Sequence, residues 1–267
     1  MKTPFFLSLL FVLTLSACTP DIYLPERTNA PLLHKAGELK LTASTKLQNS
    51  PSGSKHGFSP SLDFSASPIK GLGVLASFRS TSRYAINEGF SYGTFPISKD
   101  SFHYTGKKGE AGLGYYHPLG AKGILDVYGG GALGNIERKS LKGSGKDYRT
   151  QYYQLFVQPG IGFRVKDIFE FGGGVRVNYH KYFSFQSQNT DTRYHFTDQK
   201  INIEDANLIF LCPFIDVNVG YKYVKFNVQM GLNSNVNGSL LMENSPLYAS
   251  MGLTFTFLPR WYSLPLE

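Results

Sequence analysis

Apolar and polar residues alternate with a period of two along most of this 267-residue chain, and no other feature constrains its fold as strongly. Leu39, Leu41 and Ala43, for example, alternate with Lys40 and Thr42. Because successive side chains of a β-strand point to opposite faces, this period predicts strands with one apolar and one polar face. After residue 36 no segment has a convincing helical period. The predicted fold class is therefore all-β.

Ten alternating segments are separated by turn signals, which predicts an up-and-down antiparallel β-barrel of about ten strands, with eight as the alternative count. Their ranges are 37–47, 57–67, 71–81, 104–117, 123–138, 150–165, 169–185, 207–219, 223–234 and 246–258. Tight turns near 68–71, 118–123, 166–168 and 220–222 alternate with longer connections near 48–56, 82–103, 139–149, 186–206 and 235–245. This asymmetry is typical of transmembrane barrels of the outer membrane, whose short turns are periplasmic and long loops extracellular. We expect the barrel over 37–258 and a periplasmic tail over 259–267.

A soluble lipocalin-like barrel shares the period of two but has its faces reversed. Three features favour the membrane form: long strands, aromatic residues near strand ends, and a polar face of mixed charge. The aromatic residues, expected to form two interfacial belts, are Tyr115, Tyr116, Tyr128, Tyr152, Tyr153, Tyr182, Phe183, Tyr221 and Tyr223. Charges expected to pair inside the barrel are Glu38, Lys40, Asp63, Arg79, Glu110, Asp126, Arg164, Glu170, Arg176, Asp216 and Lys225. Pro60, Pro159 and Pro213 oppose regular pairing, and we expect a β-bulge at each.

The chain starts with a short basic end and an apolar run, which predicts a cleaved signal peptide over residues 1–17. The run ends in Leu15-Ser16-Ala17-Cys18, which resembles the lipobox of bacterial lipoproteins. That resemblance implies that Cys18 becomes the mature N-terminus and carries acyl groups, such as palmitate. Residues 18–36 contain three prolines and no sustained period, so we expect an extended periplasmic tether.

This tether also resembles the start of a group of uncharacterised outer-membrane β-barrel lipoproteins of the Bacteroidota. The matching pieces are Cys18-Thr-Pro20, Tyr23-Leu-Pro25, Asn29-Ala-Pro31-Leu32-Leu33 and Gly37-Glu38. Surface lipoproteins of that phylum usually carry an acidic run just after the cysteine, whereas this chain has Thr19-Pro20-Asp21-Ile22. The resemblance therefore implies a lipid anchor in the outer membrane with the N-terminus on the periplasmic side.

The formal net charge of +8 does not indicate nucleic acid in an exported chain, so we expect anionic lipids of the outer membrane as partners. The third long connection concentrates positive charge. Its candidate residues for binding lipopolysaccharide phosphates are Lys139, Lys142, Lys146 and Arg149, with a solvated basic rim as the alternative interpretation. Other outer-membrane or periplasmic proteins are further candidate partners.

The sequence predicts no cofactor, metal site or catalytic set. No two of the six histidines have metal-ligand spacing, and there is no nucleophile elbow or Walker loop. His103 and His195 fall in predicted extracellular loops, where they are candidates for a lipid A-directed hydrolase. Cys212 is expected to be a small apolar filler. The predicted function is a structural or interaction role in the cell envelope, with a narrow solute channel, a lipid-binding lipocalin-like lipoprotein and a hydrolase as alternatives.

Overall fold

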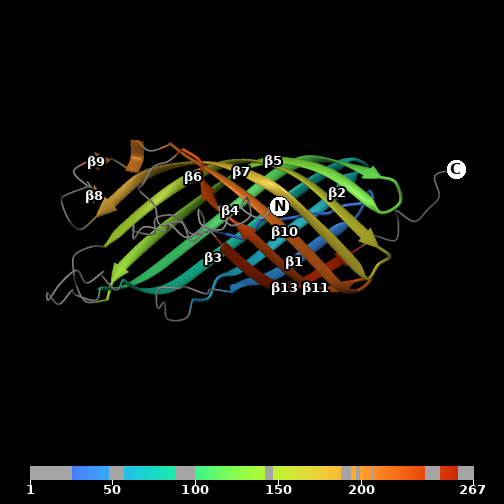
Figure 1. Ribbon diagram of the computed structural model, residues 1–267, viewed down its shortest axis with the longest axis horizontal. Coiled ribbons are helices and arrows are strands. Elements are labelled where there is room, and N and C mark those ends of the chain that lie inside the picture. The colour runs from blue at the N-terminus through green and yellow to red at the C-terminus, as the bar shows by residue number, and fades with distance from the viewer. Residues whose placement is uncertain are drawn as a thin grey trace, which may run out of the picture.

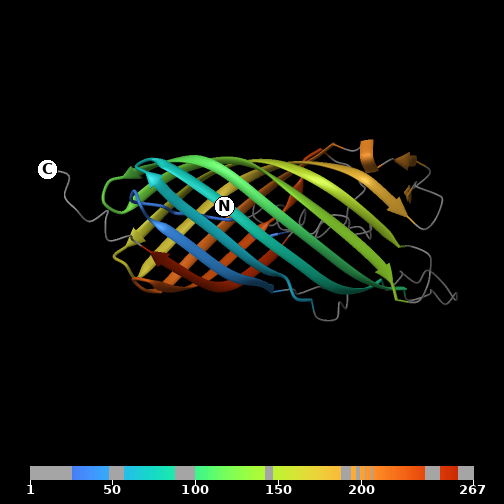
Figure 2. The same ribbon diagram turned by 180° about the vertical axis from the view of Figure 1, so that it is seen from behind.

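The computed structural model describes residues 26–47, 57–87, 100–141, 147–187, 194–196, 199–201, 203–205, 207–237 and 247–257. Within these ranges, ten strands form one closed antiparallel barrel, as Figures 1 and 2 show. They are β1 (Leu39–Leu47), β2 (Pro60–Ile69), β3 (Leu72–Asn87), β4 (Asp100–Leu119), β5 (Gly123–Ser140), β6 (Tyr148–Val165), β7 (Phe169–Ser187), β10 (Asn207–Tyr221), β11 (Val224–Leu232) and β13 (Leu247–Phe257). β1 pairs with both β2 and β13, and β11 pairs with both β10 and β13. The ring is closed, and the predicted count of ten is confirmed.

Minor elements lie beyond this ring. β8 (Tyr194–Phe196) and β9 (Gln199–Ile201) form a small hairpin, β12 (Ser234–Asn235) pairs with β10, and η1 (Ile203–Asp205) is one turn of 3-10 helix. None of the described helical residues belongs to a helix that is long and apolar enough to cross a membrane.

The wall of the barrel is tall on one side and low on the other. β3 to β7 and β10 contain 15–20 residues each, whereas β1, β2, β11 and β13 contain 9–11. The tall strands project toward the long-loop end, which is clear in Figure 2. The predicted loop over 82–103 was too long, because β3 continues to Asn87 and β4 begins at Asp100. Alternation continues there through polar residues.

The two faces of the strands follow the membrane pattern. Large apolar side chains point outward and are exposed, as at Leu62, Phe78, Leu113, Leu133 and Leu155. Polar and charged side chains point inward and are buried, among them Lys40, Asp63, Arg79, Lys108, Glu110, Glu170, Arg176, Asp216 and Lys225. A soluble barrel places its apolar face inward, so the lipocalin-like alternative is wrong.

The predicted aromatic belts are only partly correct. Tyr116, Tyr128, Tyr152 and Tyr182 are buried inside the barrel, while the other five of the nine aromatic residues lie on the outer face. Neighbours along a strand, such as Tyr152 and Tyr153, must point to opposite faces. The aromatic rings that point inward occupy space left by glycines on the neighbouring strand. For example, a Cβ added at Gly114 would overlap the ring of Tyr128.

The predicted bulges at Pro60 and Pro213 are wrong, and Pro159 opposes Val127 of β5 in an unshifted register, although the pairs of β6 with β7 are interrupted between Val157 and Gly160. Pro60 is the first residue of β2, and Pro213 opposes Val175 in an unshifted register. The register shifts among the described strands lie instead at Ala66/Ile69 and Arg149/Gln151. β-strands tolerate proline where no ladder hydrogen bond is required of its nitrogen, so these prolines need no extra residue.

Candidate functional site

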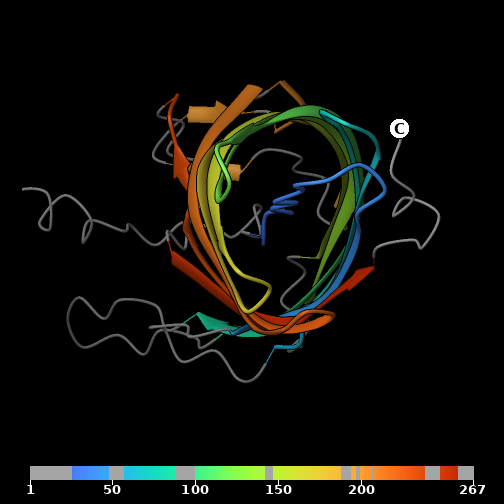
Figure 3. The ribbon, with the colours of Figure 1, turned by 90° about the vertical axis from the view of Figure 1, so that its right-hand side faces the viewer.

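The interior of the barrel is occupied by the chain itself. Residues 26–37, here called the plug segment, run inside the ring of strands, as the end-on view of Figure 3 shows. Arg27, Thr28, Asn29, Leu32 and Leu33 are at most 6% exposed. The sequence predicts an extended periplasmic tether over residues 18–36. The described part of that range, residues 26–36, lies inside it.

Side chains of the wall hold the plug backbone as a neighbouring strand would. The Thr28 amide donates to Oε1 of Gln229 and the Thr28 carbonyl accepts from Nε2 of the same side chain, both at 2.8 Å. The Asn29 carbonyl accepts from Nε2 of Gln158 at 2.8 Å, and its side-chain amide donates to the Phe64 and Ala76 carbonyls at 3.1 and 3.2 Å. A proline-rich segment forms no regular structure of its own, so these glutamines satisfy its buried polar groups.

Leu32 and Leu33 anchor the plug segment near the short-turn end. Together with Tyr116 and Ile124 they form a buried apolar cluster. Leu32 lies against Gly162 and Gly172, where an added Cβ would come within 2.4 and 2.7 Å of its side chain. Leu32 has a φ of 45°, a strained conformation for a leucine, which this packing stabilises.

At mid-depth a chain of alternating charges crosses the lumen through Arg27. Arg27 contacts Asp63 at 2.8 Å and Asp216 at 3.5 Å. Asp63 also contacts Arg79 at 3.1 Å, Arg79 contacts Glu110 at 3.4 Å, and Glu110 contacts Arg176 at 2.6 Å. We call these six residues the lumen network: Arg27, Asp63, Arg79, Glu110, Arg176 and Asp216. Each buried charge in it has an oppositely charged partner, as buried ions require.

A second group of charges, the basal cluster, lies where the plug segment meets β1. Its members are Glu38, Lys40, Arg164, Glu170 and Lys225. Glu170 lies 2.9 Å from both lysines and 2.7 Å from Arg164, and Arg164 also contacts Glu38 at 2.5 Å. The Leu32 carbonyl of the plug segment accepts from Lys40 at 2.9 Å. The predicted pairing of lumen charges is thus confirmed for ten of the eleven residues; Asp126 makes no ion pair within the described ranges.

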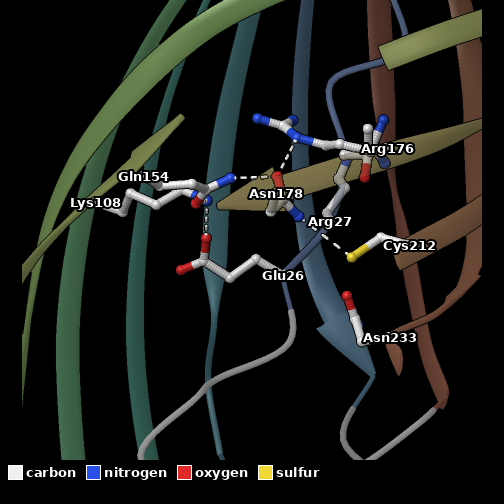
Figure 4. Close-up of a pocket in the computed structure, with 9 residues that line it drawn as sticks. Glu26, Arg27, Lys108, Gln154, Arg176, Asn178, Cys212 and Asn233 are labelled. Carbon is white, nitrogen blue, oxygen red and sulfur yellow. Dashed lines mark hydrogen bonds and ion pairs between the residues drawn. The ribbon is translucent and has the colours of Figure 1, made fainter. Parts of the chain in front are cut away.

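The space around the start of the plug segment is small and polar (Figure 4). Glu26 forms an ion pair with Lys108, whose Nζ donates to Gln154 at 3.1 Å. The cavity between these residues and Asn233 has a volume of about 10 Å³, which is room for one water molecule.

The predicted lipidation and lipopolysaccharide residues are only partly covered by the structure. Cys18, Lys142 and Lys146 lie outside the described residues. Lys139 and Arg149 are exposed on the outer face at the loop ends of β5 and β6. They lie on adjacent strands, and Lys139 forms an exposed ion pair with Glu137 at 3.2 Å.

The histidine candidates have different surroundings. Nε2 of His103 lies 3.0 Å from Oγ of Ser82 on the outer face, and the ring of Tyr84 stacks on the imidazole at 4.3 Å between centroids. His195 lies in β8, opposite Lys200. Cys212 is buried in an aromatic cluster and accepts from Asn178 at 3.2 Å, in keeping with a filler. Among the described residues no group of three His, Cys, Asp or Glu is arranged to hold a metal ion.

The closed ring, the apolar outer face and the charged, filled interior are now established together. The chain is an outer-membrane β-barrel. A soluble barrel buries its apolar face, whereas a barrel in lipid turns its apolar face outward and its polar face toward the interior. The even number of strands and the alternation of short turns with long loops agree with this assignment.

No protein-family model matches this outer-membrane barrel, and no curated protein matches it. Solved structures of outer-membrane proteins align with most of the chain, at low identity and with TM-scores below 0.5. The translocator domain of the autotransporter NalP from Neisseria meningitidis aligns with 84% of this chain and 90% of its own, at 11% identity and a TM-score of 0.45. OprG from Pseudomonas aeruginosa covers 85% and 98% at 13% identity with a TM-score of 0.35. The β domain of the Bordetella autotransporter Brka covers 84% and 100% at 14% identity with a TM-score of 0.43.

Proposed function

We propose that this protein is a non-conducting outer-membrane anchor with a structural or interaction role in the cell envelope. The observation that carries the proposal is the plug segment, whose residues fill the lumen at mid-depth and join its charges. A ten-stranded barrel leaves little interior space even without a plug. Because internal ion pairs fill the lumen, the surfaces available for contacts with other molecules are the loops and the outer face, and the lumen is not a passage.

Planar-bilayer recording tests the closed lumen. The intact protein is expected to give no discrete conductance steps, and deletion of residues 27–33 is expected to produce small ones. Lys35→Ala, in an exposed part of the plug segment, is the matched control and should stay silent. Heat-modifiable migration on a gel establishes that each variant is a folded barrel. Steps from the intact protein would overturn the proposal in favour of a narrow channel.

We further propose that acyl groups on Cys18 add a second membrane attachment, as the lipobox resemblance implies. Metabolic labelling with a palmitate analogue should mark the wild-type protein and not Cys18→Ala. Label retained by Cys18→Ala, or absent from the wild type, would exclude acylation at this residue. Two attachments exceed what a barrel needs for retention, so the lipid would position the N-terminus rather than hold the protein in the membrane.

The basic loop residues remain the proposed contact for lipopolysaccharide. Lys139 and Arg149 point outward, nearer to the loop ends than Tyr153 and Tyr179. Aromatic side chains on the outer face are typical of the lipid headgroup level, which supports a headgroup contact for the two basic residues. Lipopolysaccharide retained on the purified protein should fall when Lys139, Lys142, Lys146 and Arg149 are all replaced by Gln. The matched control replaces four exposed lysines of the short turns: Lys70, Lys122, Lys166 and Lys222. Equal loss in both sets would indicate a general charge effect and no site.

A second candidate function, ester hydrolysis on outer-leaflet lipid, is favoured by the contact between Ser82 and His103. In this reaction Oγ of Ser82 attacks an acyl carbonyl while His103 takes the hydroxyl proton. His103 then returns the proton to the departing alkoxide, and water releases the fatty acid. His103 lies opposite Lys139 in the register, which places the pair beside the proposed headgroup site. Among the described residues no carboxylate orients the imidazole, so this is a dyad.

Mass spectrometry of lipid A and phospholipids from cells with and without the protein tests this reaction. Acyl loss should depend on both Ser82 and His103 and survive Ser80→Ala, which changes a serine on the same face of β3. Unchanged lipids, or a change that survives Ser82→Ala, would exclude the dyad and leave the anchor role standing.

A further inference from the structure

The plug segment has a direction inside the barrel. At its later end, the Gly37 amide donates to the Ser67 carbonyl at 2.6 Å, beside the short turn between β2 and β3. At its earlier end, Glu26 lies beside Lys108 and Asn233, far from the short turns. Followed backward from β1, the chain therefore climbs through the lumen toward the long-loop end.

The described residues leave no open path through the lumen from Glu26 back to the short-turn end. The lumen below Glu26 holds the plug segment itself, the lumen network and the basal cluster. The cavity at Glu26 has a volume of about 10 Å³, whereas a second pass of the backbone would displace many times that volume. The paired strands of the closed ring block a sideways exit. Only the long-loop end remains.

Glu26 is already near the rim on the low side of the wall. Asn233 directly follows Leu232, the last residue of β11, and it lines the same cavity as Glu26. Tyr248, the second residue of β13, contacts Thr28 at 3.5 Å. The neighbouring strands β1 and β2 are similarly short, so the start of the described plug segment lies beside the low wall that β1, β2, β11 and β13 form.

We propose that the polypeptide passes through the barrel and that Cys18 lies on the long-loop side, with its acyl groups in the outer leaflet. Residues 18–25 span at most about 29 Å when extended, enough to cross the low rim and reach the lipid beside it. The lipid part of this inference rests on the proposed acylation of Cys18. This placement is opposite to the periplasmic N-terminus that the sequence predicts. The protein would then be a lipoprotein whose acyl groups are on the cell-surface side and whose tether runs through the barrel.

Thiol labelling in intact cells tests the placement. Asp21→Cys, in a Cys212→Ala background, is exposed to a membrane-impermeant maleimide. It should be labelled in intact cells to the same extent as Lys139→Cys at the loop end. Lys70→Cys, in a short turn, should be labelled only after the outer membrane is permeabilised. Labelling of Asp21→Cys only in permeabilised cells, or in neither condition, overturns the inference.

The same cells separate this inference from acylation. Palmitate incorporation reports the modification of Cys18, and maleimide labelling reports the side on which residue 21 emerges. Surface labelling without palmitate incorporation would support the path through the barrel and exclude acylation. Palmitate incorporation with labelling only after permeabilisation would support acylation and exclude the path.

Discussion

Arg27 ties the plug segment to the wall through a single guanidinium. It is buried and contacts carboxylates from β2 and β10. Replacing it by Ala leaves Asp216 without an ion pair, and breaking a buried pair costs about 3–5 kcal/mol. We expect Arg27→Ala to lower the temperature at which the barrel unfolds on a gel, while Lys35→Ala leaves it unchanged. Equal unfolding temperatures for Arg27→Ala and wild type would show that the network does not depend on the plug.

His34 gives the plug segment a pH dependence. Burial lowers its pKa from 6.5 to about 4, and the nearby Arg164 and Lys40 cations act in the same direction. Between pH 6.5 and pH 4 the unfolded chain binds a proton that the folded chain does not, so stability falls as the pH drops through this window. His34→Gln should reduce the loss of stability between pH 7 and pH 4.5, measured by thermal unfolding in detergent. An unchanged pH slope would contradict this.

Pairing of the lumen charges could be predicted from the sequence because strand alternation fixes which side chains share the interior. Arg27 could not be, since it lies among prolines with no period to place it. One signal was available: Gly162 and Gly172 present no side chains to the lumen, which leaves space that some other part of the chain must fill. That space is taken by Leu32.

Leu32 and the glycine pair of β6 and β7 form the fitted contact between plug and wall. A Cβ at Gly172 would lie 2.7 Å from Leu32, and overpacking of this kind costs about 1–3 kcal/mol. Gly172→Ala should destabilise the barrel, and adding Leu32→Ala should recover part of the loss, as a double-mutant cycle in denaturant would show. Gly109→Ala, where an added Cβ meets nothing within 4 Å, is the control. Strict additivity would mean that the two residues do not contact.

The strands themselves were predicted to within a few residues at their turn ends, because glycine, proline and charged residues punctuate the alternation there. The loop ends of β3 and β4 were missed, because these two strands extend through polar residues such as Ser82 and Ser101 that resemble a loop in composition. The prediction of the aromatic belts was partly wrong for the same reason. Composition shows where aromatic residues gather along the chain, whereas only the strand register shows which face each side chain takes.

The outer face of the barrel holds the molecule in the membrane, whether or not Cys18 is acylated. The large exposed apolar side chains that the structure describes belong to nine of the ten strands of the ring, all except β1, and their transfer to water is unfavourable. Cys18→Ala is therefore expected to remain in the outer-membrane fraction and to keep its heat-modifiable migration. Recovery of Cys18→Ala in the soluble periplasm would contradict an integral barrel.

The ring of strands encloses a segment of the same chain that builds it. The plug segment continues directly into β1, and β1 closes the ring by pairing with β13, so that Leu39 lies opposite Phe257. This seam joins residues from opposite ends of the chain, and contacts of such long sequence separation form slowly. The barrel must therefore close around a segment that is already in place. Acyl groups at the far end of that segment would then act as a stopper, because they cannot be drawn back through the filled lumen. The plug and the ring would separate only when the seam between β1 and β13 opens.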